Sequence, residues 1–221
     1  ATPPPEEGGE EPPTTADPTS GPGAAYDTTD GVTLPEASVV PDSCAVFDMR
    51  SGSLPEGVDV IGDHILDVQD DGSTILLLGQ FGHLRVRLPE HFSGNQKGER
   101  INSYTLTMDV RVSDIPEHGY SLFQTGFPDY HDSDEAVLSP IGTIGAFSEF
   151  GETPMFKVGK WNRVVIAVGG NFEGYGEHKQ RKMTTYINGR KCVEITEPMW
   201  GYGKDTRFSV DPKGFMLFVS N

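Results

Sequence analysis

The stretch Tyr104-Thr-Leu-Thr-Met-Asp-Val-Arg-Val112 decides the fold class of this chain. Apolar side chains recur in it at every second residue, the period at which a β-strand turns its side chains to one face. They are Tyr104, Leu106, Met108, Val110 and Val112. A helix would need a repeat of three or four residues, and no helical stripe of useful length appears in the sequence. The stretch therefore predicts a half-buried strand in an all-β domain.

Further stretches with strand character lie on both sides of it. The alternation returns in 83–88 and 184–188, whereas 161–168 is continuously apolar, as a central strand of a sandwich can be. Trp161 opens that strand, so we assign it to the core. Additional strands are expected at 45–49, 64–68, 73–79, 120–125, 141–147, 191–195 and 214–219. Asn188-Gly189 predicts a tight hairpin, because both turn positions need positive φ. Many short strands separated by turns predict a two-sheet antiparallel β-sandwich or jelly roll.

Composition divides the chain into two parts. Of its 221 residues, 1–43 contain nine acidic residues, nine of the 17 prolines and no Lys or Arg. Such a segment has too little apolar surface to offset the entropy of ordering, so we expect an extended acidic arm. The folded domain is expected over 44–221.

The formal net charge of −16 bears on the kind of partner. Phosphates of nucleic acids and of anionic membranes would meet like charge, which leaves basic protein surfaces as the favoured partners. No apolar run approaches the roughly 20 residues needed to cross a bilayer. The sequence starts Ala-Thr-Pro-Pro-Pro without an initiator Met, as it would after removal of a targeting segment. That start favours an extracytoplasmic or organellar-lumen location.

Two cysteines are too few for a disulfide framework. Cys44 lies at the start of the expected domain and Cys192 near its end. They could form a bridge if the first and the late strands are neighbours, or they could be two buried free thiols.

Five stretches resemble the framework of laminin-G-like domains, which belong to the concanavalin-A-like lectin and glucanase superfamily. Residues 103–110 and 120–125 resemble the first long inner strand and its partner, and 159–168 is similar to the Gly-x-Trp-x-x-hydrophobic strand. Thr185-Tyr-Ile-Asn-Gly189 resembles the Tyr-hydrophobic-Asp/Asn-Gly hairpin, and 215–220 resembles a late strand. The resemblance covers 44–221 and concerns scaffold residues, so it implies a fold much more than a function.

The resemblance also implies one strand more than this sequence provides. Laminin-G-like domains usually continue for a further strand after the segment that matches 215–220. Either that strand is missing here or another element covers the edge that it would occupy. An exposed edge strand invites pairing, so a partner contact is expected there.

Catalytic motifs are missing from the sequence. Glucanases of the resembling superfamily place their carboxylates on one strand as Glu-x-Asp-x-x-Glu, and the nearest string here is Glu149-Phe-Gly-Glu152. That string has the wrong spacing and follows no alternating strand, so we interpret it as two glutamates in a solvated loop. There is no Gly-x-Ser-x-Gly nucleophile motif, and the six histidines lack zinc-like spacing. We therefore expect no catalytic residues.

The loop 126–135 is a candidate calcium site. Its four carboxylates belong to Asp129, Asp132, Asp134 and Glu135, and the imidazole of His131 lies among them. Calcium takes six to eight oxygen ligands, which closely spaced carboxylates and loop carbonyls can supply. Laminin-G-like relatives often hold calcium at the rim of the sandwich. The alternative is a polar loop in solvent without a metal.

Two other loops carry aromatic side chains that suit a binding surface. These are Phe172, Tyr175, Trp200 and Tyr202. They could stack on sugar rings, anchor a protein partner, or, in the case of Trp200, cap the core. The sequence thus predicts a non-catalytic recognition or assembly module, an accessory or linker subunit that docks on a protein through rim loops and the acidic arm. A lectin-like glycan-binding domain, with or without calcium, is the alternative, and a glycoside hydrolase with an unrecognised site is the third.

Overall fold

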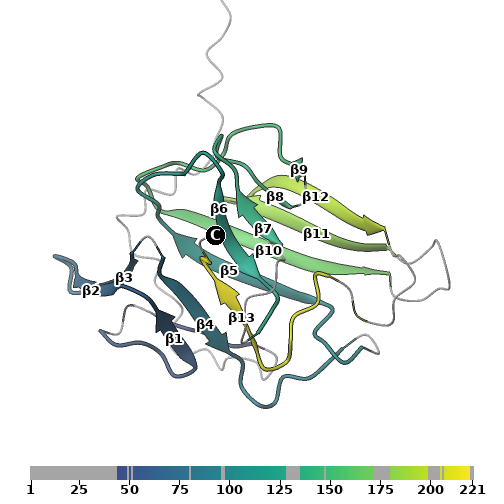
Figure 1. Ribbon diagram of the computed structural model, residues 1–221, viewed down its shortest axis with the longest axis horizontal. Helices are drawn as coiled ribbons and strands as arrows, with labels where there is room; N and C mark the ends of the chain where they lie inside the picture. The colour runs from purple at the N-terminus through teal and green to yellow at the C-terminus, as the bar shows by residue number, and fades with distance from the viewer. Residues whose placement is uncertain are drawn as a thin grey trace, which may run out of the picture. The chain divides into compact units, whose positions relative to one another are not determined.

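A computed structural model describes residues 44–48, 50, 52–79, 81–95, 98–127, 135–146, 148–171, 180–198, 205 and 207–219. The strands in this part of the chain form antiparallel sheets (Figure 1). The all-β class that the alternation predicts is therefore confirmed. No helix in the described part is long and apolar enough to span a membrane.

The largest sheet has seven strands. In spatial order they are β1 (Val58–Ile61), β4 (His83–Arg87), β13 (Gly214–Leu217), β6 (Tyr120–Gln124), β7 (Ala136–Leu138), β8 (Ile144–Ala146) and β9 (Glu149–Phe150). The late strand β13 lies between β4 and β6, since Met216 pairs with Arg85 on one side and with Gln124 on the other. Both edges of β13 are thus covered within this sheet.

The second sheet has four strands, in the order β12 (Arg190–Pro198), β11 (Gln180–Ile187), β10 (Asn162–Asn171) and β5 (Tyr104–Val110). The predicted hairpin joins β11 to β12, and Asn188 and Gly189 adopt φ values of 50° and 78°. The side chains of β5 alternate as predicted, with 105, 107 and 109 exposed and the residues between them at least half-buried.

A smaller sheet consists of β2 (His64–Val68) and β3 (Thr74–Leu78) alone. The Gln69 N–H donates to the Ser73 carbonyl at 2.8 Å and closes the connecting turn, in which Gly72 has a φ of 82°. Neither strand pairs with another strand among the described residues. We call this pair the hairpin below.

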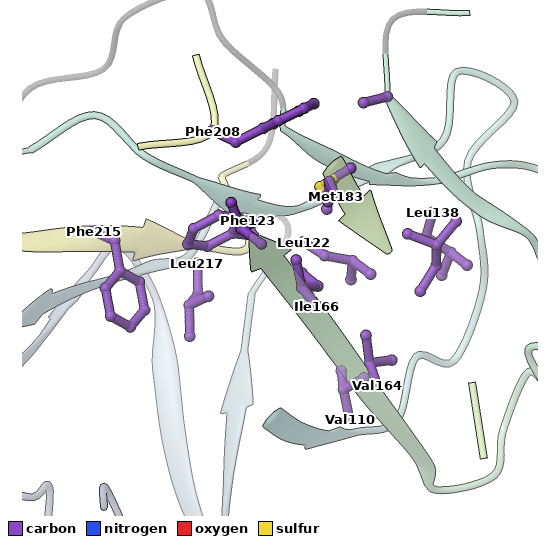
Figure 2. Packing of buried hydrophobic residues seen from close by; sticks show 14 of the residues in the cluster. Val110, Leu122, Phe123, Leu138, Val164, Ile166, Met183, Phe208, Phe215 and Leu217 are labelled. Atoms are coloured by element: carbon purple, nitrogen blue, oxygen red, sulfur yellow. The ribbon is translucent and has the colours of Figure 1, made fainter. Parts of the chain in front are cut away.

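Both larger sheets contribute to one hydrophobic core. Leu122 and Phe123 of β6, Ile166 of β10 and Met183 of β11 are at most 1% exposed, and Figure 2 shows their side chains gathered together. The Phe123 ring also packs against the ring of Phe215, with centroids 5.7 Å apart. Burial of each such side chain stabilises the fold by roughly 1.5–3 kcal/mol. Because both sheets contribute side chains to this one core, the structure is sandwich-like.

The assignment of Trp161 to the core is wrong. The buried residues of β10 are even-numbered, among them Val164 and Ile166, so an odd-numbered neighbour faces the other way. Trp161 is half-buried, and the guanidinium carbon of Arg111 lies 5.6 Å from its ring centroid. A continuously apolar run does not reveal whether its odd-numbered or its even-numbered side chains face the core. The prediction placed an odd-numbered residue, Trp161, in the core.

Other strand predictions need correction as well. Residues 44–48 form no strand although Phe47 packs against the core. The short strands β1, β7 and β9 were not predicted. They have four, three and two residues, which is too short for an alternation of apolar and polar side chains to be recognised in the sequence.

The two cysteines do not form a disulfide. Cys44 is exposed, whereas Cys192 is half-buried and links β12 to β8. Its Sγ accepts a hydrogen bond from the Ile144 N–H at 3.3 Å. Cys192 therefore packs where β12, the edge strand of the four-stranded sheet, meets β8, the strand next to the edge of the seven-stranded sheet. Its sulfur is not cross-linked to Cys44.

The outer edge of β5 has no strand neighbour among the described residues. The Asn188 N–H donates to the Arg163 carbonyl, so odd-numbered residues of β10 direct their backbone groups toward β11. Even-numbered residues then face β5, and Val164 is opposite Met108. By the same alternation, the N–H and C=O groups of Thr105, Thr107 and Asp109 point away from the sheet.

Hydrogen exchange tests this register. We expect the amides of Thr105, Thr107 and Asp109 to exchange several-fold faster than those of Leu106 and Met108, because only the latter donate within the sheet. Residue-resolved exchange by NMR measures the difference directly. Equal protection along β5 would mean that another segment covers this edge.

Candidate functional site

Each of the three loops that carry the predicted site residues has at least one described residue bonded to a polar cluster. The first follows β6 and precedes β7, the second joins β10 to β11, and the third joins β12 to β13. Seven of the eight predicted residues lie outside the part of the chain that the structure describes: Asp129, Asp132, Asp134, Phe172, Tyr175, Trp200 and Tyr202. The described residues at the ends of these loops show how the loops are held.

Glu135 closes the base of the first loop. Its side chain is fully buried, and its Oε2 accepts a hydrogen bond from the Thr125 N–H at 2.8 Å. This contact joins the residue after β6 to the residue before β7. Glu135 was predicted as a calcium ligand, and the structure shows one of its oxygens occupied by a backbone amide.

Asn102 lies at the centre of the cluster and is also fully buried. Its Nδ2 is within hydrogen-bond distance of the carbonyls of Asn95 and Arg100 and of Asp205 Oδ1, at 3.0, 3.1 and 3.0 Å, so its two protons are shared among three acceptors. Its Oδ1 accepts from the Arg181 guanidinium and from the Ser209 hydroxyl. One amide group thus contacts the segment before β5, the start of β11 and the connection before β13.

Arg181 places a guanidinium in the interior, where its side chain is 3% exposed. It stands at the start of β11, on the same face as the buried Met183 and Ile187. Its Nη1 donates to Ser209 Oγ at 3.0 Å as well as to Asn102. A buried cation is costly unless it has hydrogen-bond partners, so these acceptors are a condition for the burial of Arg181.

Asp205 anchors the third loop to the same cluster. Besides Asn102, the backbone N–H groups of Arg100 and Glu99 donate to its carboxylate at 3.0 and 3.2 Å. Burial pushes the pKa of Asp205 upward, but these hydrogen bonds, together with the charge of Arg181, outweigh burial and lower the pKa below its ordinary value.

Tyr104 connects the cluster to the sheet. Its hydroxyl donates to the Phe208 carbonyl at 2.7 Å, and burial raises its pKa well above the usual value. The negative charge of Glu135 raises this pKa further, while Arg100 opposes the shift. Arg100 also donates to the Thr125 carbonyl at 2.9 Å, so the first loop is tied to the segment before β5.

Sequence reasoning missed this cluster, although one signal was present. Arg181 stands two residues before Met183 in a strand whose odd-numbered residues, through Ile187, face the core. A charged residue at a position that should face the core indicates a buried polar contact. Its partners could not be found in this way, because Asn102 and Ser209 lie 79 and 28 residues away along the chain.

Metal ligands and paired carboxylates are the groups that the other candidate functions would need. No group of three or more His, Cys, Asp or Glu side chains in it is arranged to hold a metal ion. Glu149 and Glu152 are both exposed, as expected for solvated glutamates. The cluster positions the loops that carry the predicted binding residues.

A shallow depression of about 370 Å³ lies on the four-stranded sheet. Its lining includes Thr105, Ala167, Thr184 and Lys182, which offer hydroxyls and an ammonium group to a ligand. Lys182 donates to Glu194 at 2.8 Å, and this bond, with a second from Lys191, lowers the pKa of Glu194 to about 2. The depression is lined by side chains that can donate hydrogen bonds.

The chain matches no protein-family model, and no curated protein is significantly similar to it.

Removal of the Asn102 amide tests its central position. We expect Asn102→Ala to lower the free energy of unfolding by about 3 kcal/mol, because Arg181 and Asp205 lose a buried partner. Ser209→Ala should cost about 1 kcal/mol, and Ser113→Ala, at an exposed position, less than about 0.5 kcal/mol. Urea unfolding of the three variants gives these values. An Asn102→Ala cost no larger than that of Ser113→Ala would contradict the central role.

The lowered pKa of Asp205 predicts that the free energy of unfolding depends on pH. Its pKa is lowered in the folded state, so its charge stabilises the fold above the ordinary pKa of 3.8. This contribution is lost as the pH falls through the folded-state pKa. Asp205→Asn should therefore be less stable than the wild type at neutral pH, and the difference should shrink below pH 3.8. Urea midpoints measured over a pH series test this, and a constant difference would be evidence against it.

Proposed function

We propose that this chain is a non-catalytic recognition or assembly domain with a laminin-G-like jelly-roll fold. It docks on a protein partner through the three rim loops and the acidic arm, as an accessory or linker subunit does. The observation that supports this proposal is that at least one described residue of each loop or of its flanking strand is bonded to one polar cluster. Binding residues on loops act best when a rigid scaffold positions them.

The cluster gives the rim a fixed base at three points. Glu135 holds the first loop through Thr125, Arg181 holds the end of the second, and Asp205 holds the third. Each of these side chains is bonded to a backbone group or to a buried polar side chain. Aromatic and acidic residues that follow such a base lose less conformational entropy on binding than residues on unsupported loops.

The composition of the rim favours a protein partner. Trp and Tyr, which the second and third loops carry, are the residues that most often dominate protein interfaces. The nine acidic residues of the arm would increase the rate of association with a basic partner, an effect that salt screens. The rim would then provide affinity, and the arm would provide attraction at longer range.

A lectin-like function is the second candidate. The depression on the four-stranded sheet favours it, because the hydroxyls of Thr105 and Thr184 and the ammonium of Lys182 can bond to sugar hydroxyls. Calcium bound by Asp129, Asp132 and Asp134 would belong to this candidate, since carboxylates in one loop can hold calcium near a glycan.

Two full-length variants test the proposed function. The rim variant combines Tyr175→Ala with Trp200→Ala, and its control is Ile141→Ser, which changes an apolar residue that is 61% exposed. We expect the immobilised wild type and the control to capture and cross-link one specific protein from an extract of the source cells. The rim variant should bind that protein at least about tenfold more weakly, as expected when interface anchors are removed.

The arm variant replaces the nine acidic residues of 1–43 by their amides. It should retain the captured protein but lose much of the salt dependence of binding. Equal capture by the rim variant would contradict docking through the rim. A glycan array that binds the wild type, with loss of binding in Lys182→Ala, would instead establish the lectin-like function.

A further inference from the structure

The hairpin presents apolar side chains to solvent. Ile65 of β2 pairs with Leu77 of β3, and residues opposite each other in an antiparallel pair lie on the same face. Ile65 is 63% exposed and Leu77 39% exposed. Phe81, in the turn that follows β3, is 71% exposed. We call these three residues the hairpin patch.

Backbone contacts place Phe81 at the same end of the hairpin as the other two. The Gly79 N–H donates to the Asp63 carbonyl at 2.8 Å, next to the Ile65–Leu77 pair. A Cβ atom added to Gly62 would lie 3.0 Å from the Phe81 carbonyl oxygen. The turn that carries Phe81 therefore abuts the start of β2, and the hairpin patch is confined to one end of the hairpin.

The hairpin patch is not needed to attach the hairpin to the domain. The opposite face of β3 does this, because Leu76 and Leu78 pack against the core and Thr74 is 3% exposed. Figure 1 shows the hairpin extending away from β1 and β4. Scattered single apolar residues on a surface are ordinary, but a group of large ones together at the base of the hairpin, the end next to β1 and β4, indicates a binding surface.

The aspartates of the hairpin and of the residue before it carry charge of one sign, with no Lys or Arg beside them in the sequence. The sequence from 51 to 84 contains no Lys or Arg, and the hairpin carries four aspartates: Asp63, Asp67, Asp70 and Asp71. None of them forms an ion pair with a cationic side chain in the described part. Asp67 accepts from the Gln69 amide and Asp71 from Ser73, so their partners are neutral and their charge remains uncompensated. Asp67 also shares the face of Ile65 and Leu77.

We propose that the hairpin patch binds a protein segment in which apolar side chains are flanked by Lys or Arg. The apolar side chains would cover Ile65, Leu77 and Phe81, and the cations would neutralise Asp63 and Asp67. A second copy of this chain is the less favourable occupant, because it would bring four further aspartates against these four. No residue of the hairpin patch belongs to the three loops, so this is a second contact beyond the proposed function.

A fluorescently labelled peptide that alternates Leu with Lys is the probe, and the same peptide with Glu in place of Lys is its control. Full-length wild type should bind the Lys peptide and not the Glu peptide in an anisotropy titration. Ile65→Ser/Leu77→Ser/Phe81→Ser should weaken binding at least about tenfold. The matched variant Ile141→Ser/Val158→Ser, which alters residues 61% and 48% exposed on other elements, should bind as the wild type does.

A second pair of variants separates charge from apolar contact. Asp63→Asn/Asp67→Asn should weaken binding at low salt and reduce its salt dependence, whereas Glu117→Gln/Glu152→Gln should leave both unchanged. All of these positions except Leu77 are strongly exposed, and circular dichroism of each variant confirms that the fold is retained.

Three results would overturn the proposal. The first is equal binding of the Lys peptide to the triple serine variant. The second is equal binding of the Glu peptide and the Lys peptide to the wild type. The third is self-association of the wild type in sedimentation velocity that the triple variant abolishes, because the occupant would then be a second copy. The rim variant Tyr175→Ala/Trp200→Ala should still bind the Lys peptide, so the hairpin and the rim can fail independently.

Discussion

The Asn102 side chain is the contact on which the rest of the structure depends. It is the acceptor for a buried guanidinium and the donor to a carboxylate, and it lies where segments from three parts of the chain meet. A buried Arg181 without an acceptor would cost several kcal/mol. The amide also needs the close approach of Gly98, since a side chain there would overlap Asn102 and Asp205. Removal of this one group would loosen the second and third loops together, because Arg181 and Asp205 both bond to it.

The structure divides its surface into regions with strong and weak support. The rim is tied to buried charges and to the ends of β6, β7 and β11, so its base moves with the core. The hairpin has support on one face only, through Leu76 and Leu78. If the proposed contacts exist, a firmly held base under the loops suits partners with a fixed shape, whereas a hairpin with exposed apolar side chains suits a segment that folds over it. The two surfaces therefore differ in how they are attached to the core as well as in composition.

The sequence predicted what depends on neighbours along the chain and missed what depends on distant residues. The strand at Tyr104–Val110 and the turn at Asn188-Gly189 follow from local periodicity and from turn chemistry, and both were predicted correctly. Trp161 was misplaced because a continuously apolar run does not specify its inward parity. The polar cluster joins Asn102 to Asp205, which is 103 residues away, and no local pattern encodes such a contact.

A polar base under the rim cannot be explained by stability alone. Well-packed apolar residues in place of Arg181, Asn102 and Ser209 would be of similar or greater stability, because desolvation of a cation offsets much of what its hydrogen bonds contribute. Apolar contacts, however, lack direction and allow neighbouring segments to slide, whereas the hydrogen bonds of Asn102 require its partners to lie at particular distances and angles. The bonds that Asn102 accepts from Arg181 and Ser209 and donates to Asp205 thus fix these segments relative to β5 at a cost in desolvation. That cost is justified if the orientation of the rim matters for binding, which is the premise of the docking function.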